Sequence, residues 1–288
     1  HGSGTTNPSK CYWHIMDQFE EQSKKPIRMT YRAVGSSTGQ ADFIGNPADS
    51  TIPRNHFGSG DIPIPTATYQ NMTDQGIGIL QLPVLLGAIS FFHSVPTGSE
   101  QLFVDGCVLA KIFKREITDW NDAEIKDLNP NLNLKNPFPI TVAHRVQGSS
   151  STKSITGYLN KVCPTVWTSD LVDKEIDWEP DTIGCEGSGG MTTCIREMEG
   201  TIGYIDSGHG HAEGLQEIEL KNADGNYLSS KDANAKGGIL AAASEKSGLP
   251  TEVDGNFGEV DLLNAEGPNT WPIVALSYVY VRKDLTGF

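Results

Sequence analysis

Residues 140–152 read ITVAHRVQGSSST, and this stretch decides the fold class of the chain. Its first five residues have the pattern of a strand, and the polar run 147–152 ends that strand. Apolar residues at helical spacing follow over 154–162. A strand joined to a helix through a short loop is the repeating unit of α/β proteins, so the stretch predicts an α/β fold.

Short strands and helices alternate along the rest of the chain in the same way. The 31 glycines and 16 prolines divide the sequence into short elements, and we find no internal repeat. We expect helices over residues 9–24, 107–113, 122–128, 154–162 and 239–246, and a short helix after the turn 35–39. We expect strands over residues 27–31, 83–92, 140–144, 201–205 and 273–281.

Composition excludes several classes of protein. Of the 288 residues, 37% are hydrophobic, which is enough to build a packed core. No apolar run is as long as the roughly 18 residues that a membrane-spanning helix requires. The 22 basic and 36 acidic residues leave a net charge of −14, so we expect no nucleic-acid partner, because Lys and Arg hold phosphate backbones.

The cysteine positions bear on the redox compartment. No Cys-x-x-Cys pair occurs, which argues against a zinc ribbon or a thioredoxin motif; the five cysteines are Cys11, Cys107, Cys163, Cys185 and Cys194. Cys185 and Cys194 flank a glycine-rich turn at 186–190, which would let their thiols meet. We expect a disulfide between them and an oxidising compartment; the alternative is five buried, inert thiols.

Three turns of small residues, at 2–7, 35–39 and 147–152, each precede an expected helix. Such loops present backbone N–H groups, hydroxyl donors and the positive end of a helix dipole to an anion. The third turn follows Arg145, whose planar guanidinium suits a tetrahedral oxyanion. The three turns therefore predict an oxyanion site, although each could instead serve only as a helix cap.

Sequence signatures of catalysis and of metal binding are weak. Residues 58–61 read GSGD, which is not a nucleophile elbow, and no P-loop pattern occurs. His209 and His211 lie among glycines without further ligands at metal-binding spacing, so we expect a loop there rather than a metal site. We predict no catalytic residue, no metal and no cofactor.

Eight strings in the sequence resemble the phosphate-binding proteins of phosphate ABC transporters. They occur in that family's order and at similar intervals over nearly the whole chain: GSGTT at 2–6, YRAVGSS at 31–37, FGSGDIP at 57–63, LPV at 82–84, ITDWND at 117–122, LNP at 128–130, ITVAHR at 140–145 and GTIGYI at 200–205. The strings TDWND and GTIGY are the most specific. Agreement of eight ordered strings by chance is negligible.

The resemblance implies an architecture and a function. It implies a two-lobed Venus-flytrap fold of the type II periplasmic binding class, with phosphate held in the cleft between the lobes. One lobe would contain residues 1–82 and 232–288, and the other residues 83–231. The resemblance also implies a monomer outside the cytoplasm, with inorganic phosphate as ligand and an ABC transporter permease as partner.

The resemblance further implies ligand contacts at positions that coincide with the three small-residue turns. The expected ligand-binding residues are Thr5, Thr6, Ser36, Asp61, Arg145, Gln147, Ser149, Ser150 and Ser151. Among them, Asp61 would accept the hydrogen bond from the proton on phosphate, and Arg145 would be the cation of the second lobe. The serines would be hydrogen-bond donors.

Three positions depart from the pattern of that family. Gln147 stands where the family has an Asp paired with the Arg, Ser150 replaces a Gly, and Asn7 replaces an aromatic residue. These departures leave the order of preference among phosphate, arsenate and sulfate open. They also leave open a second hypothesis, a secreted structural, adhesive or sensing protein that keeps the fold with altered or lost oxyanion binding. The family's chains continue beyond the last strand, so we expect this chain to be a piece of a longer protein.

Overall fold

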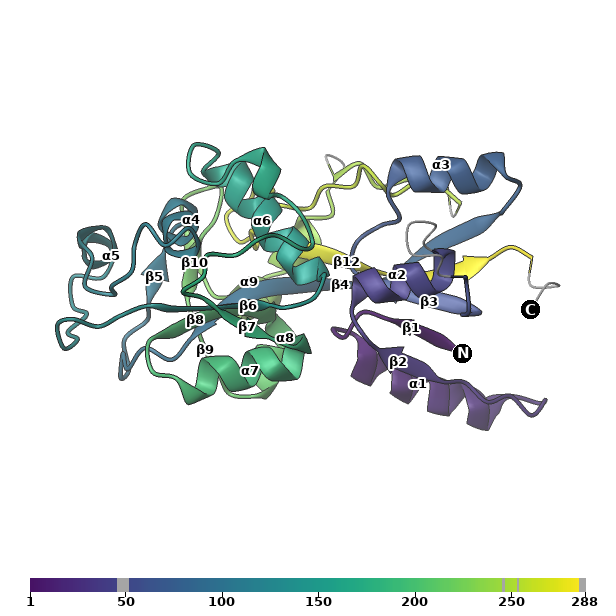
Figure 1. The fold of residues 1–288 in the computed structure, drawn as a ribbon, viewed down its shortest axis with the longest axis horizontal. Helices are drawn as coiled ribbons and strands as arrows, with labels where there is room; N and C mark the ends of the chain where they lie inside the picture. The colour runs from purple at the N-terminus through teal and green to yellow at the C-terminus, as the bar shows by residue number, and fades with distance from the viewer. Residues whose placement is uncertain (46–51, 245–246, 253, 285–288) are drawn as a thin grey trace.

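The computed structural model of the protein describes residues 1–45, 52–244, 247–252 and 254–284. Strands and helices alternate along the chain in two lobes joined side by side (Figure 1). The strands are β1 (Gly2–Gly4), β2 (Tyr31–Ala33), β3 (Phe57–Gly60), β4 (Ile79–His93), β5 (Phe103–Val104), β6 (Thr141–Arg145), β7 (Ile183–Cys185), β8 (Thr201–Asp206), β9 (Gln216–Glu217), β10 (Glu219–Lys221), β11 (Tyr227–Leu228) and β12 (Val274–Arg282).

Helices cover both faces of the sheet in each lobe. They are α1 (Ser9–Gln22), α2 (Ser36–Ile44), α3 (Thr66–Asp74), α4 (Gly106–Phe113), α5 (Ala123–Leu128), α6 (Ser150–Val162), α7 (Gly187–Glu197), α8 (Ser207–Ala212), α9 (Ser230–Ala235), α10 (Gly238–Ala241) and the 3₁₀ helix η1 (Ser169–Leu171). In Figure 1, α1 and α7 lie below the strands, and α2 and α6 lie above them. The expected α/β fold is therefore confirmed.

One sheet runs through both lobes. Its strand order is β2-β1-β3-β12-β4-β8-β6-β7, with β9 added beside β4. Two parallel groups, β1 to β3 and β6 to β8, are joined by β4 and β12, which pair antiparallel with each other. A second sheet of three short strands has the order β11-β10-β5. The pair β4–β12 is thus the covalent and hydrogen-bonded connection between the lobes.

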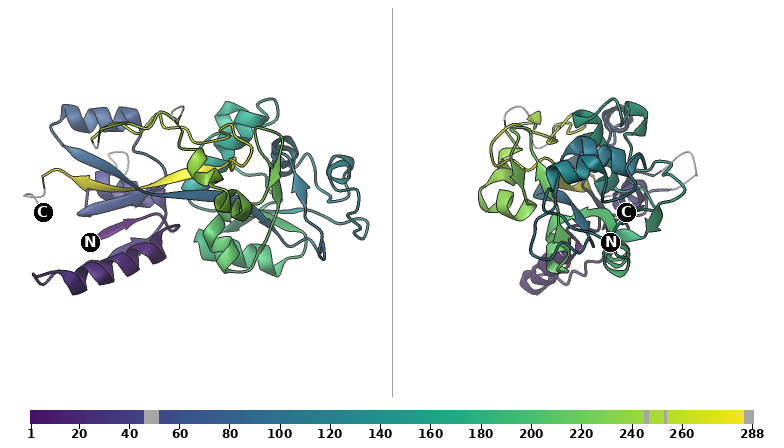
Figure 2. Two further views of the ribbon diagram at one scale, coloured as in Figure 1. Left: turned by 180° about the vertical axis from the view of Figure 1, so that it is seen from behind. Right: turned by 90° about the vertical axis from the view of Figure 1, so that its left-hand side faces the viewer.

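The strand β4 changes its partner where the chain passes from one lobe to the other. Its first part, up to Ala88, pairs with β12, and its last part, from Ile89, pairs with β8. The indole of Trp271, which is fully buried, donates a hydrogen bond to the carbonyl of Ile89 at 2.9 Å. Figure 2 shows β4 and β12 running from one lobe into the other. The residue bounds of the lobes, 1–82 with 232–288 and 83–231, stay a prediction.

An aromatic cluster in the core of the second lobe fixes one residue that reaches the site described below. The ring of Tyr204 on β8 lies 6.0 Å from that of Phe113 and 6.3 Å from that of Trp178. The ring of Trp178 also stacks on His144 at 4.9 Å. Aromatic pairs at these separations add packing energy beyond their buried area. The Tyr204 hydroxyl is therefore held in one position at the end of β6.

Most of the predicted elements are confirmed, with shifted ends, but the turn predicted at residues 2–4 and the loop predicted at residues 209–211 are wrong. Gly2–Gly4, expected in a turn before a helix, form the strand β1. Glycine is required there for close packing against β3, because a Cβ at Gly4 would lie only 1.9 Å from the carbonyl oxygen of Ser59 on β3. Residues 209–211, expected in a loop, lie in the helix α8. Asp206 caps that helix by accepting a hydrogen bond from the His209 N–H, and Gly210 leaves room for the Phe92 ring.

Other predicted elements differ in extent. The strand expected at 27–31 lies instead at Tyr31–Ala33. It has only three residues, because its partner β1 offers only three residues for pairing. The helix expected from residue 154 begins at Ser150, because Ser149 caps it by accepting a hydrogen bond from the Ser151 N–H. The helix expected at 239–246 is limited to Gly238–Ala241, and residues 245–246 lie outside the described residues.

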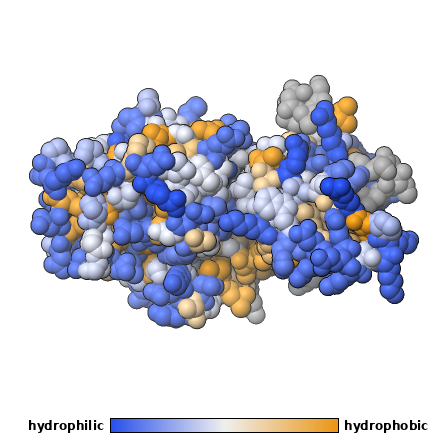
Figure 3. Space-filling model, turned by 90° about the horizontal axis from the view of Figure 1, so that it is seen from below, coloured by the Kyte–Doolittle hydropathy of each residue, from blue (hydrophilic) through white to orange (hydrophobic). Residues whose placement is uncertain are grey.

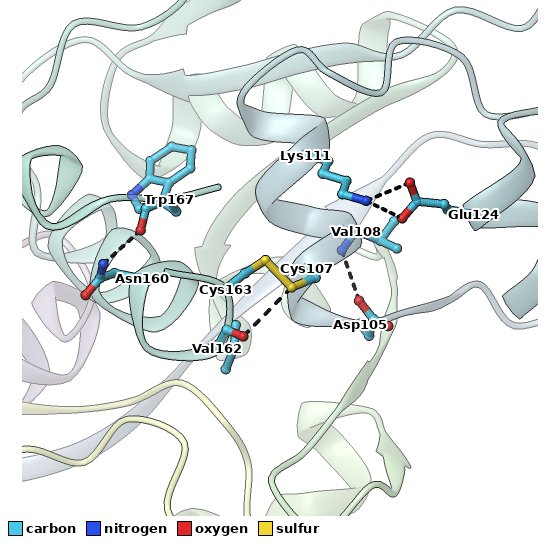
Figure 4. Close-up of a disulfide and its surroundings, with 9 residues drawn as sticks. All are labelled: Asp105, Cys107, Val108, Lys111, Glu124, Asn160, Val162, Cys163 and Trp167. Carbon is cyan, nitrogen blue, oxygen red and sulfur yellow. Dashed lines mark hydrogen bonds and ion pairs between the residues drawn. A yellow bond between two sulfur atoms is a disulfide. The ribbon is translucent and has the colours of Figure 1, made fainter. Parts of the chain in front are cut away.

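Two disulfides stabilise the second lobe. The predicted bond between Cys185 and Cys194 is confirmed, so the alternative of five inert thiols is wrong. A second bond, not predicted, joins Cys107 at the start of α4 to Cys163 at the end of α6, across 56 residues of sequence (Figure 4). Cys11 on α1 is unpaired and exposed. Two disulfides are consistent with an oxidising environment.

The surface of the molecule agrees with its acidic, polar composition. The face drawn in Figure 3 is mainly hydrophilic, and its hydrophobic residues form several separate patches. Within the ranges that the structure describes, none of the helices combines the length and the apolar character needed to cross a bilayer.

The two disulfides predict unequal contributions to stability. Removing Cys107–Cys163 by the double substitution Cys107→Ala/Cys163→Ala should lower the free energy of unfolding by about 4 kcal/mol, because the bond closes a long loop in the unfolded chain. The Cys185–Cys194 bond closes a much shorter loop, so the double substitution Cys185→Ala/Cys194→Ala should lower the free energy of unfolding by about 3 kcal/mol. Urea unfolding of both variants tests this order. A larger loss from the Cys185–Cys194 pair would contradict it.

Candidate functional site

Loops from both lobes converge where the lobes meet. In the first lobe, Thr5 follows β1, Asp61 follows β3 and Ser36 begins α2. In the second lobe, Arg145 ends β6 and Ser150 begins α6. The carboxyl ends of parallel strands meet at one edge of a sheet, which is why segments so distant in sequence come together there.

The carboxylate of Asp61 is the centre of this group. Asp61 is only 5% exposed, and its Oδ2 accepts hydrogen bonds from the Thr5 hydroxyl, from the Asn7 amide at 2.7 Å and from the Ser150 hydroxyl at 3.0 Å. Its Oδ1 accepts a hydrogen bond from the Ser277 hydroxyl at 2.6 Å. Four donors from three separate segments therefore hold one buried carboxylate.

Two opposing effects act on the pKa of Asp61. Burial raises its pKa, because the charged form loses its hydration. The hydrogen bonds from Ser277, Thr5, Ser150 and Asn7 lower it, because each donor favours the ionised form. Burial is the larger effect, so the pKa of Asp61 lies above its ordinary value. In its ionised form, the carboxylate acts as an acceptor only.

The start of α2 contributes two hydroxyl groups. The Ser36 hydroxyl accepts a hydrogen bond from the Asp61 N–H at 3.2 Å, which fixes the two segments against each other. The neighbouring Ser37 hydroxyl is buried and has no hydrogen-bond partner among the described residues. It lies at Gly148 of the other lobe, where a Cβ would come within 2.5 Å of the Ser37 oxygen. An unpaired hydroxyl buried between the lobes is available to a ligand.

Arg145 supplies a buried positive charge. It is 8% exposed, and its Nε has no hydrogen-bond partner in the described part of the chain. Its backbone N–H donates to the Tyr204 hydroxyl at 3.1 Å, so the aromatic cluster positions it. Burial lowers the pKa of the guanidinium, and the nearby Tyr204, Asp61 and Glu186 oppose that shift. A desolvated cation with a free donor is a site for an anion.

The first turn of α6 faces the same point. Ser149, Ser150 and Ser151 are all buried, and the Ser149 hydroxyl accepts the Ser151 N–H at 3.2 Å as the helix cap. The Thr152 hydroxyl hydrogen-bonds with the Tyr204 hydroxyl at 2.7 Å. The start of this 13-residue helix therefore presents N–H groups and a positive dipole end beside Arg145.

Within this group of residues, two side-chain hydrogen bonds cross from one lobe to the other. One is the bond from Ser150 to Asp61, and the second joins the hydroxyls of Thr6 and Ser188 at 3.1 Å. Ser188 lies in the first turn of α7, beside the Cys185–Cys194 disulfide. The predicted site residues of both lobes are thus brought into one group, with Gln147 as the exception, since it is exposed.

Sequence reasoning missed three side chains in this group. In the sequence, Asn7 stands out only as a departure from the family pattern, and Ser188 only as part of the glycine-rich turn between two cysteines. Ser277 lies inside the strand β12, with nothing in its neighbourhood in the sequence to distinguish it from other strand serines. The signal for Asn7 was its place directly after the Thr-Thr string; Ser277 required the pairing of β12 with β3.

A second carboxylate lies near the site. The pKa of Asp206 is raised to about 6, mainly by burial; the charge of Asp61 contributes to this shift, and hydrogen bonds from the first turn of α8 oppose it. Asp61 also borders a cavity of about 740 Å³ between α6, β12 and residues 258–263. The described residues contain no cluster of three or more side chains that could hold a metal ion.

The chain is similar to known proteins over nearly its whole length. The model of the family described as the PBP superfamily domain matches residues 1–285. The phosphate-binding protein PstS of Haemophilus influenzae is 28% identical, over 98% of this chain and 78% of its own length. The protein of the same name from Methanocaldococcus jannaschii is 27% identical, over 98% of this chain and 72% of its own length.

Solved structures share the fold at lower sequence identity. A high-affinity periplasmic phosphate-binding protein, solved with bound phosphate, has a TM-score of 0.66 at 17% identity and covers 99% of this chain and 82% of its own. A phosphate-binding protein from Stenotrophomonas maltophilia has a TM-score of 0.63 at 16% identity, with coverages of 97% and 77%. The chain has the two-lobed type II periplasmic binding fold, and it belongs to the PBP superfamily domain family.

Proposed function

We propose that the protein binds inorganic phosphate with high affinity in the cleft between its lobes. The residues proposed to hold the anion are Thr5, Thr6, Ser36, Asp61, Arg145, Ser149, Ser150 and Ser151. Gln147 is left out because its side chain is exposed. The relatives named as phosphate-binding proteins support the choice of phosphate among oxyanions.

The observation that supports this proposal most strongly is that a cationic donor, Arg145, and an acceptor carboxylate, Asp61, are both buried in the site. Arg145 offers a desolvated donor that no described residue uses, and Asp61 is a buried carboxylate that accepts hydrogen bonds from four donors. A protonated phosphate needs both a cation for its charge and an acceptor for its own O–H. The two residues supply these two requirements.

The net charge of −14 does not oppose binding of an anion. Affinity comes from N–H groups, hydroxyls and one guanidinium aimed at the ligand over a few ångströms. The charge of the whole protein acts over longer distances and mainly lowers the rate of encounter. At physiological ionic strength that long-range field is screened beyond roughly 8 Å.

The proposal includes the setting of the protein. Two disulfides and the periplasmic relative support a place outside the cytoplasm, where the protein would act as a monomer in phosphate uptake or scavenging. An ABC transporter permease is the proposed recipient. The proposed lobes are residues 1–82 with 232–288, and residues 83–231.

Replacing Arg145 by Ala should weaken phosphate binding by about 2–4 kcal/mol, because it removes the buried partner of the anion's charge. Isothermal titration calorimetry with inorganic phosphate measures this loss. The matched control is Arg196→Ala, which removes an arginine of the same lobe whose side chain is 53% exposed and bonded to Glu213. The control should keep the parent affinity, and unchanged affinity in the Arg145 variant would refute the assignment.

The same titration separates phosphate binding from the structural or adhesive alternative. A folded parent protein that gives neither heat nor a thermal shift with phosphate would favour a protein that keeps the fold without the binding.

Replacing Asp61 by Asn should weaken phosphate and reduce its advantage over sulfate. Sulfate has no proton near neutral pH, so a sulfate oxygen beside an ionised carboxylate makes no hydrogen bond with it, and the lone pairs of the two oxygens repel each other. The Asn amide can donate to either anion. The loss for phosphate should be about 1–3 kcal/mol, the usual cost of an unmade buried hydrogen bond. If the Asn variant keeps the parent's discrimination between the two anions, Asp61 is not the selector.

Replacing Asp206 by Asn should stabilise the protein in a pH-dependent way. The pKa of Asp206 is raised from 3.8 to about 6 in the folded state, so the folded protein binds this proton more tightly than the unfolded chain. Stability from that proton is present below pH 3.8 and is lost as the pH rises through about 6. The Asn side chain keeps an acceptor for the α8 cap without this loss.

The difference in unfolding free energy between the Asp206 variant and the parent should therefore grow over this pH interval. It should reach about 3 kcal/mol above that interval, because one pKa unit corresponds to about 1.4 kcal/mol. Chemical denaturation across the interval provides the measurement, and a difference that does not change with pH would be the contrary result.

A further inference from the structure

The hydroxyl of Ser150 lies between the selecting carboxylate and the start of α6. Ser150 is 3% exposed, and its hydroxyl donates to Asp61 Oδ2 at 3.0 Å. The same oxygen already accepts from Thr5 and Asn7, so three donors share one carboxylate oxygen. Since Ser150 is the one donor of the three that comes from the second lobe, it occupies the side of Asp61 that faces the proposed ligand.

A serine hydroxyl can act as donor and as acceptor, whereas an ionised carboxylate can only accept. With its proton directed at Asp61, the Ser150 oxygen can accept a hydrogen bond from the O–H of a protonated phosphate. With its proton turned away, the same hydroxyl can donate to an anion that carries no proton. The rotation costs little, because Thr5, Asn7 and Ser277 still satisfy Asp61.

We propose that Ser150 determines the anion specificity of the site by relaxing it. The hydroxyl shields part of the carboxylate, so fully deprotonated tetrahedral dianions of the sulfate type bind with a smaller penalty than an unshielded Asp61 would impose, while protonated phosphate stays preferred. Asp61 would select against sulfate because a sulfate oxygen that faces the carboxylate makes no hydrogen bond. By donating a hydrogen bond to that oxygen, Ser150 removes part of this free-energy penalty. This inference rests on the proposed phosphate binding and concerns the same site.

The neighbouring serines do not share this role. The Ser149 hydroxyl is engaged as the cap of α6 and accepts the Ser151 N–H. The hydroxyls that approach Asp61 from its own lobe and from β12, those of Thr5 and Ser277, act as fixed donors behind the carboxylate. Ser150 alone combines a place on the second lobe with a hydrogen bond to Asp61 among the described residues.

The test compares the affinity for phosphate with the affinity for sulfate in the parent protein and in the variants Ser150→Ala and Ser150→Gly. Each anion is titrated separately into each protein by calorimetry. Removing the hydroxyl exposes the acceptor oxygen of Asp61, so both variants should prefer phosphate over sulfate about tenfold more strongly than the parent does, which corresponds to about 1.4 kcal/mol. Two substitutions are used so that a loss of folding in one leaves a measurement.

Two further variants show whether the effect acts through Asp61. Ser154→Ala removes a serine hydroxyl one turn further along the same helix, with no hydrogen bond to Asp61, and should leave the preference within about twofold of the parent. In the double variant Ser150→Ala/Asp61→Asn, the tenfold gain should disappear, because the acceptor that produces it is gone.

The outcomes distinguish the role of Ser150 from phosphate binding itself. If the preference for phosphate over sulfate is unchanged in both Ser150 variants, or rises equally in Ser154→Ala, the role of Ser150 is overturned while phosphate binding stands. A gain that persists in the double variant overturns the route through Asp61, and the proposal with it. If the folded parent and its variants give no heat with phosphate, the proposed function itself is overturned, and this inference falls with it.

Discussion

A buried carboxylate at the junction of two lobes cannot be left without hydrogen bonds, and the arrangement around Asp61 follows from this requirement. An unpaired carboxylate in such a place would cost several kcal/mol. The donors come from the loop after β1, from the first turn of α6 and from the inside of β12. Three segments that are far apart in sequence must therefore be held at one point, and the position of each lobe is fixed relative to that point.

The shared sheet brings these segments together. Ser277 lies where the pairing of β12 with β4 becomes irregular, between Ser277 and Tyr278, so the strand that connects the lobes also supplies a donor to Asp61. On the opposite side, β8 carries Tyr204, whose hydroxyl receives the N–H of Arg145. The carboxylate and the cation are thus each tied to a strand that pairs with β4 or β12.

Short-range patterns made part of this predictable from sequence. The alternation of strands and helices, the serine-rich turn after Arg145 and the disulfide across nine residues depend on neighbours in the chain. Contacts between distant residues could not be found in that way. Cys163 has no local feature that selects Cys107, and the partner of Asp61 in β12 lies 216 residues away. The strand at Gly2–Gly4 could not be predicted for the same reason, because the small size of Gly2 and Gly4 is required by the close approach of β3.

The interlobe hydrogen bonds have a consequence for the rate of exchange with solvent. Separation of the lobes exchanges the bonds Ser150–Asp61 and Thr6–Ser188 for bonds to water, while the backbone ladder of β4 and β12 can stay intact. Two such bonds have a net worth of about 1–3 kcal/mol. The ion pair between Lys161 and Asp261 adds a further contact between the proposed lobes. The site is enclosed by both lobes, so the exchange of a small ion with solvent depends on how often these contacts open.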